Sequence, residues 1–174
     1  VEEQTQSLVG DAAAALGGPI SVLINNASIF EYDNIQTSTR KNWDRHIESN
    51  LRAPFVLTQA IAALYPDAAL DENGEQLARA LVVNMVDQRV LKLTPEFMSY
   101  TIAKAALWTF TQTAAQALGP KVRVNAIDPG PTMIGARQSE QHFAQQRAAT
   151  ILGRGAGPKD ITTALQYLLD SPSV

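Results

Sequence analysis

The segment Asn84-Met-Val-Asp-Gln-Arg-Val-Leu-Lys-Leu-Thr-Pro-Glu-Phe-Met-Ser-Tyr-Thr-Ile-Ala-Lys104 joins an apolar run to a predicted helix and decides the fold. Asp87 follows the apolar run, and Tyr100 and Lys104 lie four residues apart. Residues at this spacing share a helix face, so a helix from about Ser99 would point both side chains the same way. Because a free phenol has a pKa of about 10, we predict that the Lys104 ammonium lowers the pKa of Tyr100. Asp87, Tyr100 and Lys104 would then form a proton-donating site.

Apolar runs elsewhere in the chain end in polar or turn residues, as buried parallel strands do at a ligand crevice. The last run leads into Asp128-Pro-Gly-Pro-Thr132, a turn that no helix or strand can continue through. Helical periodicity and turn signals separate the runs. The pattern predicts strands at 21–28, 79–86 and 121–127 and helices at 1–16, 46–65, 102–118 and 158–169.

Four motifs in this order resemble the short-chain dehydrogenase/reductase family. They are Asn25-Asn26-Ala27, Asn50, the pair Tyr100 and Lys104, and the Pro-Gly turn at 128–132. The resemblance covers almost the whole chain. It implies an α/β fold with a Rossmann-type, doubly wound parallel sheet, in one domain spanning residues 1–174.

Two departures from the general family pattern resemble the pteridine reductase branch. Asp87 stands where most members carry a catalytic Ser, thirteen positions before Tyr100, and Phe30 follows the Asn-Asn-Ala motif as an aromatic that could stack on a pterin. The resemblance implies NADPH-dependent reduction of a pteridine or dihydropteridine. NADH remains an alternative, because the residues that select the cofactor precede this sequence in the family pattern.

The resemblance also assigns roles to individual residues. Tyr100 would be the general acid, Lys104 would contact the nicotinamide ribose, Asp87 would join the proton relay and Asn50 would anchor a water in it. Substrate contacts would come from Phe30, Asp87 and Tyr100. Residues expected on the nicotinamide side, besides Tyr100 and Lys104, are Asn25, Ala27, Ser28, Pro129, Gly130, Pro131 and Thr132.

Other interpretations stay open for several of these residues. Asp87 could cap a turn, Phe30 could belong to the core, and Asn50 could be a helix residue bonded to backbone. The chain could also be a carbonyl or alcohol oxidoreductase, or a non-catalytic scaffold. His46 and His142 lie among polar residues without metal-ligand spacing, so we expect both at the surface and no metal site.

Composition fits a globular domain with a substantial core: 174 residues are 45% hydrophobic, with a net charge of −3 and no cysteine. This charge gives no basic surface for nucleic acid or anionic membranes, and no apolar run approaches the roughly 18 residues that span a bilayer. The expected partner is a small molecule, and cytoplasmic is the default location. A homodimer or homotetramer is implied by the resemblance alone.

The family's Gly-rich phosphate-binding turn has no counterpart here, because Gly10, Gly17 and Gly18 do not follow a strand. Relative to the family, the sequence begins at the third helix and stops before the last strand. We therefore expect a partial sheet with an unpaired edge, and weak dinucleotide binding by these residues alone. Residues 67–76 are expected to form a solvated loop, and residues 132–150 correspond to a mobile substrate loop.

Overall fold

The computed structural model describes residues 2–135 and 138–174, which include a parallel sheet with strand order β1-β4-β5. The strands are β1 (Val22–Asn25), β4 (Ala80–Met85) and β5 (Val122–Ile127). Asn25 aligns with Asn84, and Asn84 aligns with Ala126, so the carboxyl ends of the strands meet at one edge. The three strands predicted from sequence are confirmed with slightly shorter bounds.

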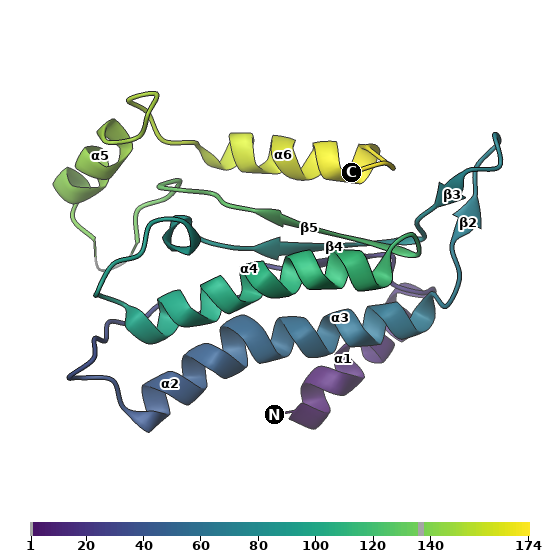
Figure 1. Ribbon diagram of the computed structural model, residues 1–174, viewed down its shortest axis with the longest axis horizontal. Helices are drawn as coiled ribbons and strands as arrows, with labels where there is room; N and C mark the ends of the chain where they lie inside the picture. Colours follow the sequence, from purple (N-terminus) through teal and green to yellow (C-terminus); the bar gives the residue numbers. More distant parts are fainter. Residues whose placement is uncertain (1, 136–137) are drawn as a thin grey trace.

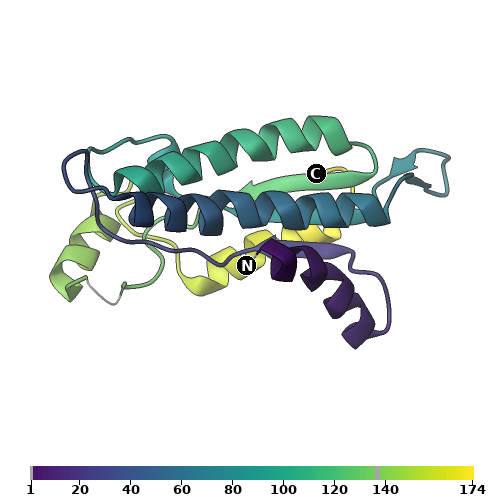
Figure 2. The ribbon, with the colours of Figure 1, turned by 90° about the horizontal axis from the view of Figure 1, so that it is seen from below.

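Helices cover both faces of this sheet (Figure 1). On one face lie α1 (Glu2–Leu16), α3 (Ala53–Leu64) and α4 (Met98–Leu118), and on the other lies α6 (Pro158–Asp170). Helices α3 and α4 run side by side in front of the sheet (Figure 2). This layered α/β arrangement confirms the Rossmann-type fold class.

Alternate residues of β4 supply two apolar cores. Val82 packs with residues of α3, α4 and β5 such as Ile61 and Ala114, whereas Leu81 and Val83 pack against α6. All of these side chains have at most 6% of their surface exposed, so β4 is buried on both faces. Because both faces are covered, β4 is a nearly continuous apolar run rather than an alternating one.

Helix α1 departs from its predicted apolar face. Val9 is buried in the core, but Leu8 and Leu16 are 52% and 77% exposed, while Val1 lies outside the described residues. The neighbouring strand β1 is at the sheet edge, as expected. Its Val22 and Ile24 are in register with Leu81 and Val83, on the side of the sheet that carries α6, and both are exposed. Sequence spacing located the helix but not the neighbour that would cover it.

The helix that carries Asn50 is longer than predicted. It begins at α2 (Arg40–Ile47), where the Thr39 side chain caps the Asn42 N–H, and runs through a π-helical turn, η1 (Glu48–Arg52), into α3. Asn50 lies inside the π turn. Such turns are frequent at functional sites, since they displace side chains from the regular helical register.

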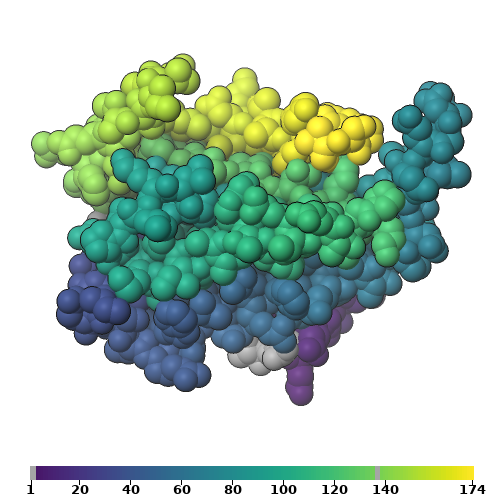
Figure 3. Space-filling model, viewed as in Figure 1, coloured from purple at the N-terminus to yellow at the C-terminus, as the bar shows by residue number. Residues whose placement is uncertain are grey.

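The connecting segments also contain structure that the sequence did not predict. Residues 67–76 include part of a short antiparallel hairpin, β2 (Ala69–Leu70) with β3 (Gln76–Leu77), which projects from the molecule (Figures 1 and 3). A short helix, α5 (Glu140–Ala148), lies within the expected substrate loop, of which residues 136–137 fall outside the described part. No helix in the described ranges is both long enough and apolar enough to cross a bilayer.

Candidate active site

Asp87 lies just beyond the carboxyl end of β4 and uses both carboxylate oxygens. Its Oδ1 accepts a hydrogen bond from the Arg89 N–H at 2.9 Å and caps the short 3-10 helix η2 (Gln88–Val90). Its Oδ2 accepts the Tyr100 hydroxyl at 2.9 Å. The turn cap and the contact with Tyr100 therefore coexist in one side chain.

The phenol of Tyr100 is buried, with 5% of its surface exposed. Burial and the adjacent Asp87 carboxylate raise the pKa of Tyr100 well above its ordinary value, and Arg89 and the Ser28 hydroxyl act in the opposite direction. The predicted lowering of this pKa by Lys104 is therefore wrong for this arrangement. The desolvation of the phenol and the anion beside it outweigh the nearby cations, so Tyr100 is protonated at neutral pH.

Lys104 is also buried, one helical turn further along α4. Its Nζ donates to the Met85 carbonyl at 2.7 Å and lies 5.9 Å from the centroid of the Tyr100 ring. Burial lowers the pKa of Lys104 to about 8, against the opposing charge of Asp87. An ammonium has three donors, so the Met85 contact leaves this group able to bind further acceptors.

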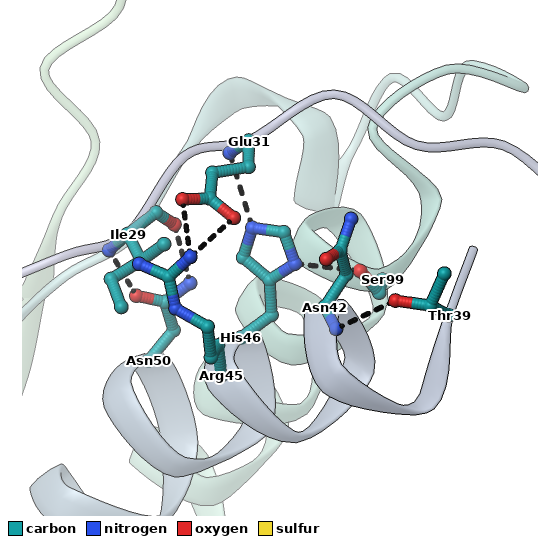
Figure 4. A network of polar contacts seen from close by, with 8 residues as sticks. All are labelled: Ile29, Glu31, Thr39, Asn42, Arg45, His46, Asn50 and Ser99. Atoms are coloured by element: carbon teal, nitrogen blue, oxygen red, sulfur yellow. Dashed lines mark hydrogen bonds and ion pairs between the residues drawn. The ribbon is translucent and has the colours of Figure 1, made fainter. Parts of the chain in front are cut away.

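Asn50 bonds to the segment that follows β1 (Figure 4). Its Oδ1 accepts the Ile29 N–H at 2.9 Å and the Ser28 hydroxyl at 3.1 Å, and its Nδ2 donates to the Ile29 carbonyl at 2.8 Å. Asn50 is 1% exposed. The alternative interpretation, a side chain that holds backbone, describes these contacts, and the water-anchoring role stays a prediction.

His46 is fully buried, so its predicted surface position is wrong, whereas His142 is exposed as expected. The His46 Nε2 accepts the Glu31 N–H at 3.1 Å, which places the ring proton on Nδ1. Nδ1 lies 2.6 Å from the Ser99 Oγ (Figure 4). The Ser99 hydroxyl in turn donates to the Asp33 carboxylate. The three buried side chains form a continuous relay of hydrogen bonds.

This relay defines the start of α4. Phe97, the residue before the helix, has a left-handed backbone (φ 55°) and provides no side-chain cap. Asp33 provides the cap instead, because its Oδ1 accepts the Ser99 N–H at 3.2 Å and its charge lies at the positive end of the helix. Hydrogen bonds from Ser99 lower the pKa of Asp33 despite the opposing effect of its desolvation. Tyr100, the next residue, is thereby fixed in position.

We expect the burial of His46 to make folding sensitive to mild acid. Burial lowers the pKa of His46 below its ordinary value of 6.5, so below that pH the unfolded chain binds a proton that the folded chain does not. The contribution is therefore fully present above about pH 6.5 and is lost as the pH falls. The free energy of unfolding should fall by up to about 1.4 kcal/mol per pH unit.

Urea unfolding between pH 5 and pH 7 measures this slope. His46→Gln should remove most of it, and His142→Gln, at an exposed position, should leave it unchanged. A wild-type unfolding free energy that is constant over this range contradicts the expectation, whether or not the His46 variant folds.

An aromatic cluster borders Tyr100. Phe30 stacks on Phe97, with ring centroids 4.2 Å apart and an interplanar angle of 10°, and meets the Tyr100 ring edge to face at 4.7 Å. Tyr32 contacts the Phe97 ring at 5.2 Å. Phe30 is 43% exposed, so it is accessible to a ligand and is not the core residue that one interpretation allowed.

Residues expected near the nicotinamide lie at the same sheet edge but differ in burial. The Asn25 side chain is buried and donates to Asn84 at 2.8 Å, and Asn84 donates to Thr111 at 2.9 Å, which ties β1, β4 and α4 together. Ala27 and Ser28 are exposed. Asn25 thus fixes the strand ends, and its contact with a cofactor stays a prediction.

The turn after β5 is held from two directions. Thr132 donates its hydroxyl to the Pro129 carbonyl at 2.5 Å, and Gly130 adopts a left-handed conformation (φ 58°) that favours glycine. From α5, the Arg147 guanidinium donates to the Pro131 carbonyl at 2.9 Å and to the carbonyls of residues 155 and 156. Arg147 therefore joins the turn at 129–132 to the start of α6.

Sequence reasoning did not identify several residues that shape this site, namely Asp33, His46, Ser99, Arg89, Phe97 and Arg147. Ser99 adjoins Tyr100 and Phe97 precedes it by one helical turn, which was a usable signal. The others come from distant segments and carry no local pattern. Within residues 2–135 and 138–174, no cluster of His, Asp and Glu side chains could hold a metal ion.

Comparisons with known proteins identify the family of the chain. Residues 1–173 match the family model described as Enoyl-(Acyl carrier protein) reductase. The structure of FolM alternative dihydrofolate reductase 1 from Brucella canis, complexed with NADP, is 39% identical with a TM-score of 0.87, over 99% of this chain and 65% of that one. Dihydromonapterin reductase of Klebsiella pneumoniae is 28% identical over 87% of this chain and 60% of its own. A probable galactose dehydrogenase of Rhizobium meliloti is 35% identical over 94% of this chain and 62% of its own.

The chain has a parallel sheet between helical layers, and Asp87, Tyr100 and Lys104 meet near the carboxyl ends of its strands. This combination places it in the class of Rossmann-type proteins. The chain belongs to the short-chain dehydrogenase/reductase family. Its similarity to FolM and to dihydromonapterin reductase supports the pteridine-reductase-like branch. The chain spans less than two thirds of the length of the relatives named above.

Proposed function

We propose that the protein reduces a pteridine or dihydropteridine with NADPH. The observation that carries the proposal is the hydrogen bond from the Tyr100 hydroxyl to the Asp87 carboxylate, 2.9 Å long, beside the accessible ring of Phe30. Reduction of a C=N bond requires a hydride on carbon and a proton on nitrogen, and a phenol paired with a carboxylate can supply the proton. A planar heteroaromatic substrate could also stack on an aromatic ring.

Each residue has a defined task in this reaction. Tyr100 donates the proton of its hydroxyl to the substrate nitrogen, and Asp87 orients that hydroxyl. After the transfer, Asp87 would relay a proton from water to the phenolate, which restores the donor. Asn50 and the Ser99 relay hold the surrounding segments rigid, so the donor is already oriented when the substrate arrives.

NADPH would supply the hydride when bound. The donor set fits it, because the Lys104 ammonium uses one of its donors on Met85 and can offer others to ribose hydroxyls. The crystal structure of the Brucella canis relative contains NADP, which favours NADPH over NADH. Residues 129–132, with Ala27 and Ser28, would border the nicotinamide.

Steady-state assays of the complete protein test the proposal. With NADPH, dihydrobiopterin should be reduced with a kcat/KM at least tenfold above that of simple ketones. Activity with ketones alone would instead support the second candidate, a carbonyl or alcohol oxidoreductase. That candidate is favoured by the 35% identity to a probable galactose dehydrogenase.

We also propose that the chain assembles through helices α3 and α4. Helices α3 and α4 lie side by side on one surface, where Phe55, 36% exposed, contacts Phe110 at 5.0 Å. A homodimer or homotetramer built on these two helices would cover the rings. A cytoplasmic location also stays a proposal.

A further inference from the structure

Arg89 lies near Tyr100, the candidate acid, and has no role in the proposed reaction. The turn η2 carries it, and Asp87 fixes that turn by accepting the Arg89 N–H. The Arg89 Cζ lies 5.6 Å from the Phe30 ring centroid and 4.9 Å from the Phe97 centroid. If the guanidinium covered the outer face of the Phe97 ring, its distance to the Phe30 centroid would exceed its distance to the Phe97 centroid by about the 4.2 Å that separates the two rings. The two distances are instead similar, so the guanidinium lies against the side of the stacked pair.

The Arg89 guanidinium contacts two aromatic rings and forms no ion pair with any residue in the described part of the chain. Among the residues that the structure describes, the ion pairs join Arg40 to Asp44 and Arg45 to Glu31, and none includes Arg89. The carboxylate of Asp87 is already engaged by the Arg89 backbone N–H and the Tyr100 hydroxyl. A half-buried guanidinium on an aromatic surface retains planar donors that match a carboxylate.

The position of Arg89 identifies the molecule that would meet it. Lys104, the group expected to contact the nicotinamide ribose, lies one helical turn after Tyr100. Arg89 lies against the side of the stacked Phe30 and Phe97 rings. Phe30 in turn contacts the Tyr100 ring at 4.7 Å. A substrate ring placed at Tyr100 and Phe30 would therefore bring its substituent close to Arg89.

We propose that Arg89 binds a carboxylate on the substituent of the pteridine substrate, so that the site favours pteridines with an acidic tail over those with a neutral one. This inference rests on the proposed function. The aromatic pair positions the guanidinium, and the guanidinium supplies a charge-assisted, two-pronged contact. The substrate class is then a pteridine linked to an acidic group, such as an amino acid.

The test compares two probes in the complete protein with NADPH: dihydrofolate, which carries a glutamate tail, and dihydrobiopterin, whose side chain is neutral. In Arg89→Gln, kcat/KM for dihydrofolate should fall by about tenfold to a hundredfold, mainly through KM, while that for dihydrobiopterin changes less than about threefold. Arg89→Lys keeps the charge and should recover part of the loss. Arg40→Gln, at an exposed position where the guanidinium pairs with Asp44, is the matched control and should change neither value.

The outcomes separate this inference from the function on which it rests. Equal losses with both probes in Arg89→Gln, or no loss with dihydrofolate, overturn the carboxylate contact but leave pteridine reduction standing. If the wild-type protein reduces neither probe, the proposed function fails and the inference fails with it. Added salt should raise the wild-type KM for dihydrofolate more than that for dihydrobiopterin, because screening weakens ionic contacts.

Discussion

Replacement of Tyr100 by Phe should lower kcat/KM for reduction of the pteridine substrate by about 10²–10⁴-fold, the range that positioned general acids contribute. The variant keeps the ring and its edge contact with Phe30, and loses only the hydroxyl that bonds to Asp87. The loss should appear in kcat more than in KM, because the proton is needed in the transition state. Steady-state kinetics of the complete protein with NADPH measure the effect.

Tyr167→Phe is the matched control, since Tyr167 lies on α6 and is 59% exposed. This variant should retain wild-type kinetics. Circular dichroism should show that Tyr100→Phe folds normally. If the Tyr100 variant keeps every measured activity, the acid role is wrong and the interpretation of the chain as a non-catalytic scaffold gains support.

Replacement of Asp87 by Asn should lower kcat/KM for pteridine reduction by about a hundredfold. The amide keeps an oxygen that can accept the Arg89 N–H, so the turn cap survives, but the negative charge beside Tyr100 is lost. The amide would orient the Tyr100 hydroxyl less firmly, and it could not relay a proton from water to the phenolate after each transfer. A ketone substrate should be affected less, because most of the family carries a Ser rather than a carboxylate at this position.

Two further variants separate chemistry from folding. Asp87→Ser installs the residue found in most of the family and should retain ketone reduction while losing pteridine reduction. Asp71→Asn is a matched control, because Asp71 also caps a turn, through the N–H groups of Asn73 and Glu75, away from the site. Equal losses of pteridine and ketone reduction in Asp87→Asn contradict a specific role in the pteridine reaction.

The sequence predicted the strands and main helices because their signals are local. The apolar run before Asp87 makes a buried strand wherever it is placed between two layers, and the four-residue spacing of Tyr100 and Lys104 puts both on one side of α4. Proximity of Asp87 to Tyr100 also followed, because a strand end and the start of the next helix meet at one sheet edge.

Only the tertiary structure decided the electrostatics. The direction of the Tyr100 pKa depends on how deeply the phenol is buried and which charge lies closest, and no spacing in the sequence carries either quantity. Likewise, His46 is buried because Ser99, 53 positions away in the sequence, and the Glu31 backbone meet its ring nitrogens. Periodicity reports which face of an element is apolar, whereas burial, hydrogen-bond partners and the position of Arg89 arise when distant segments pack together.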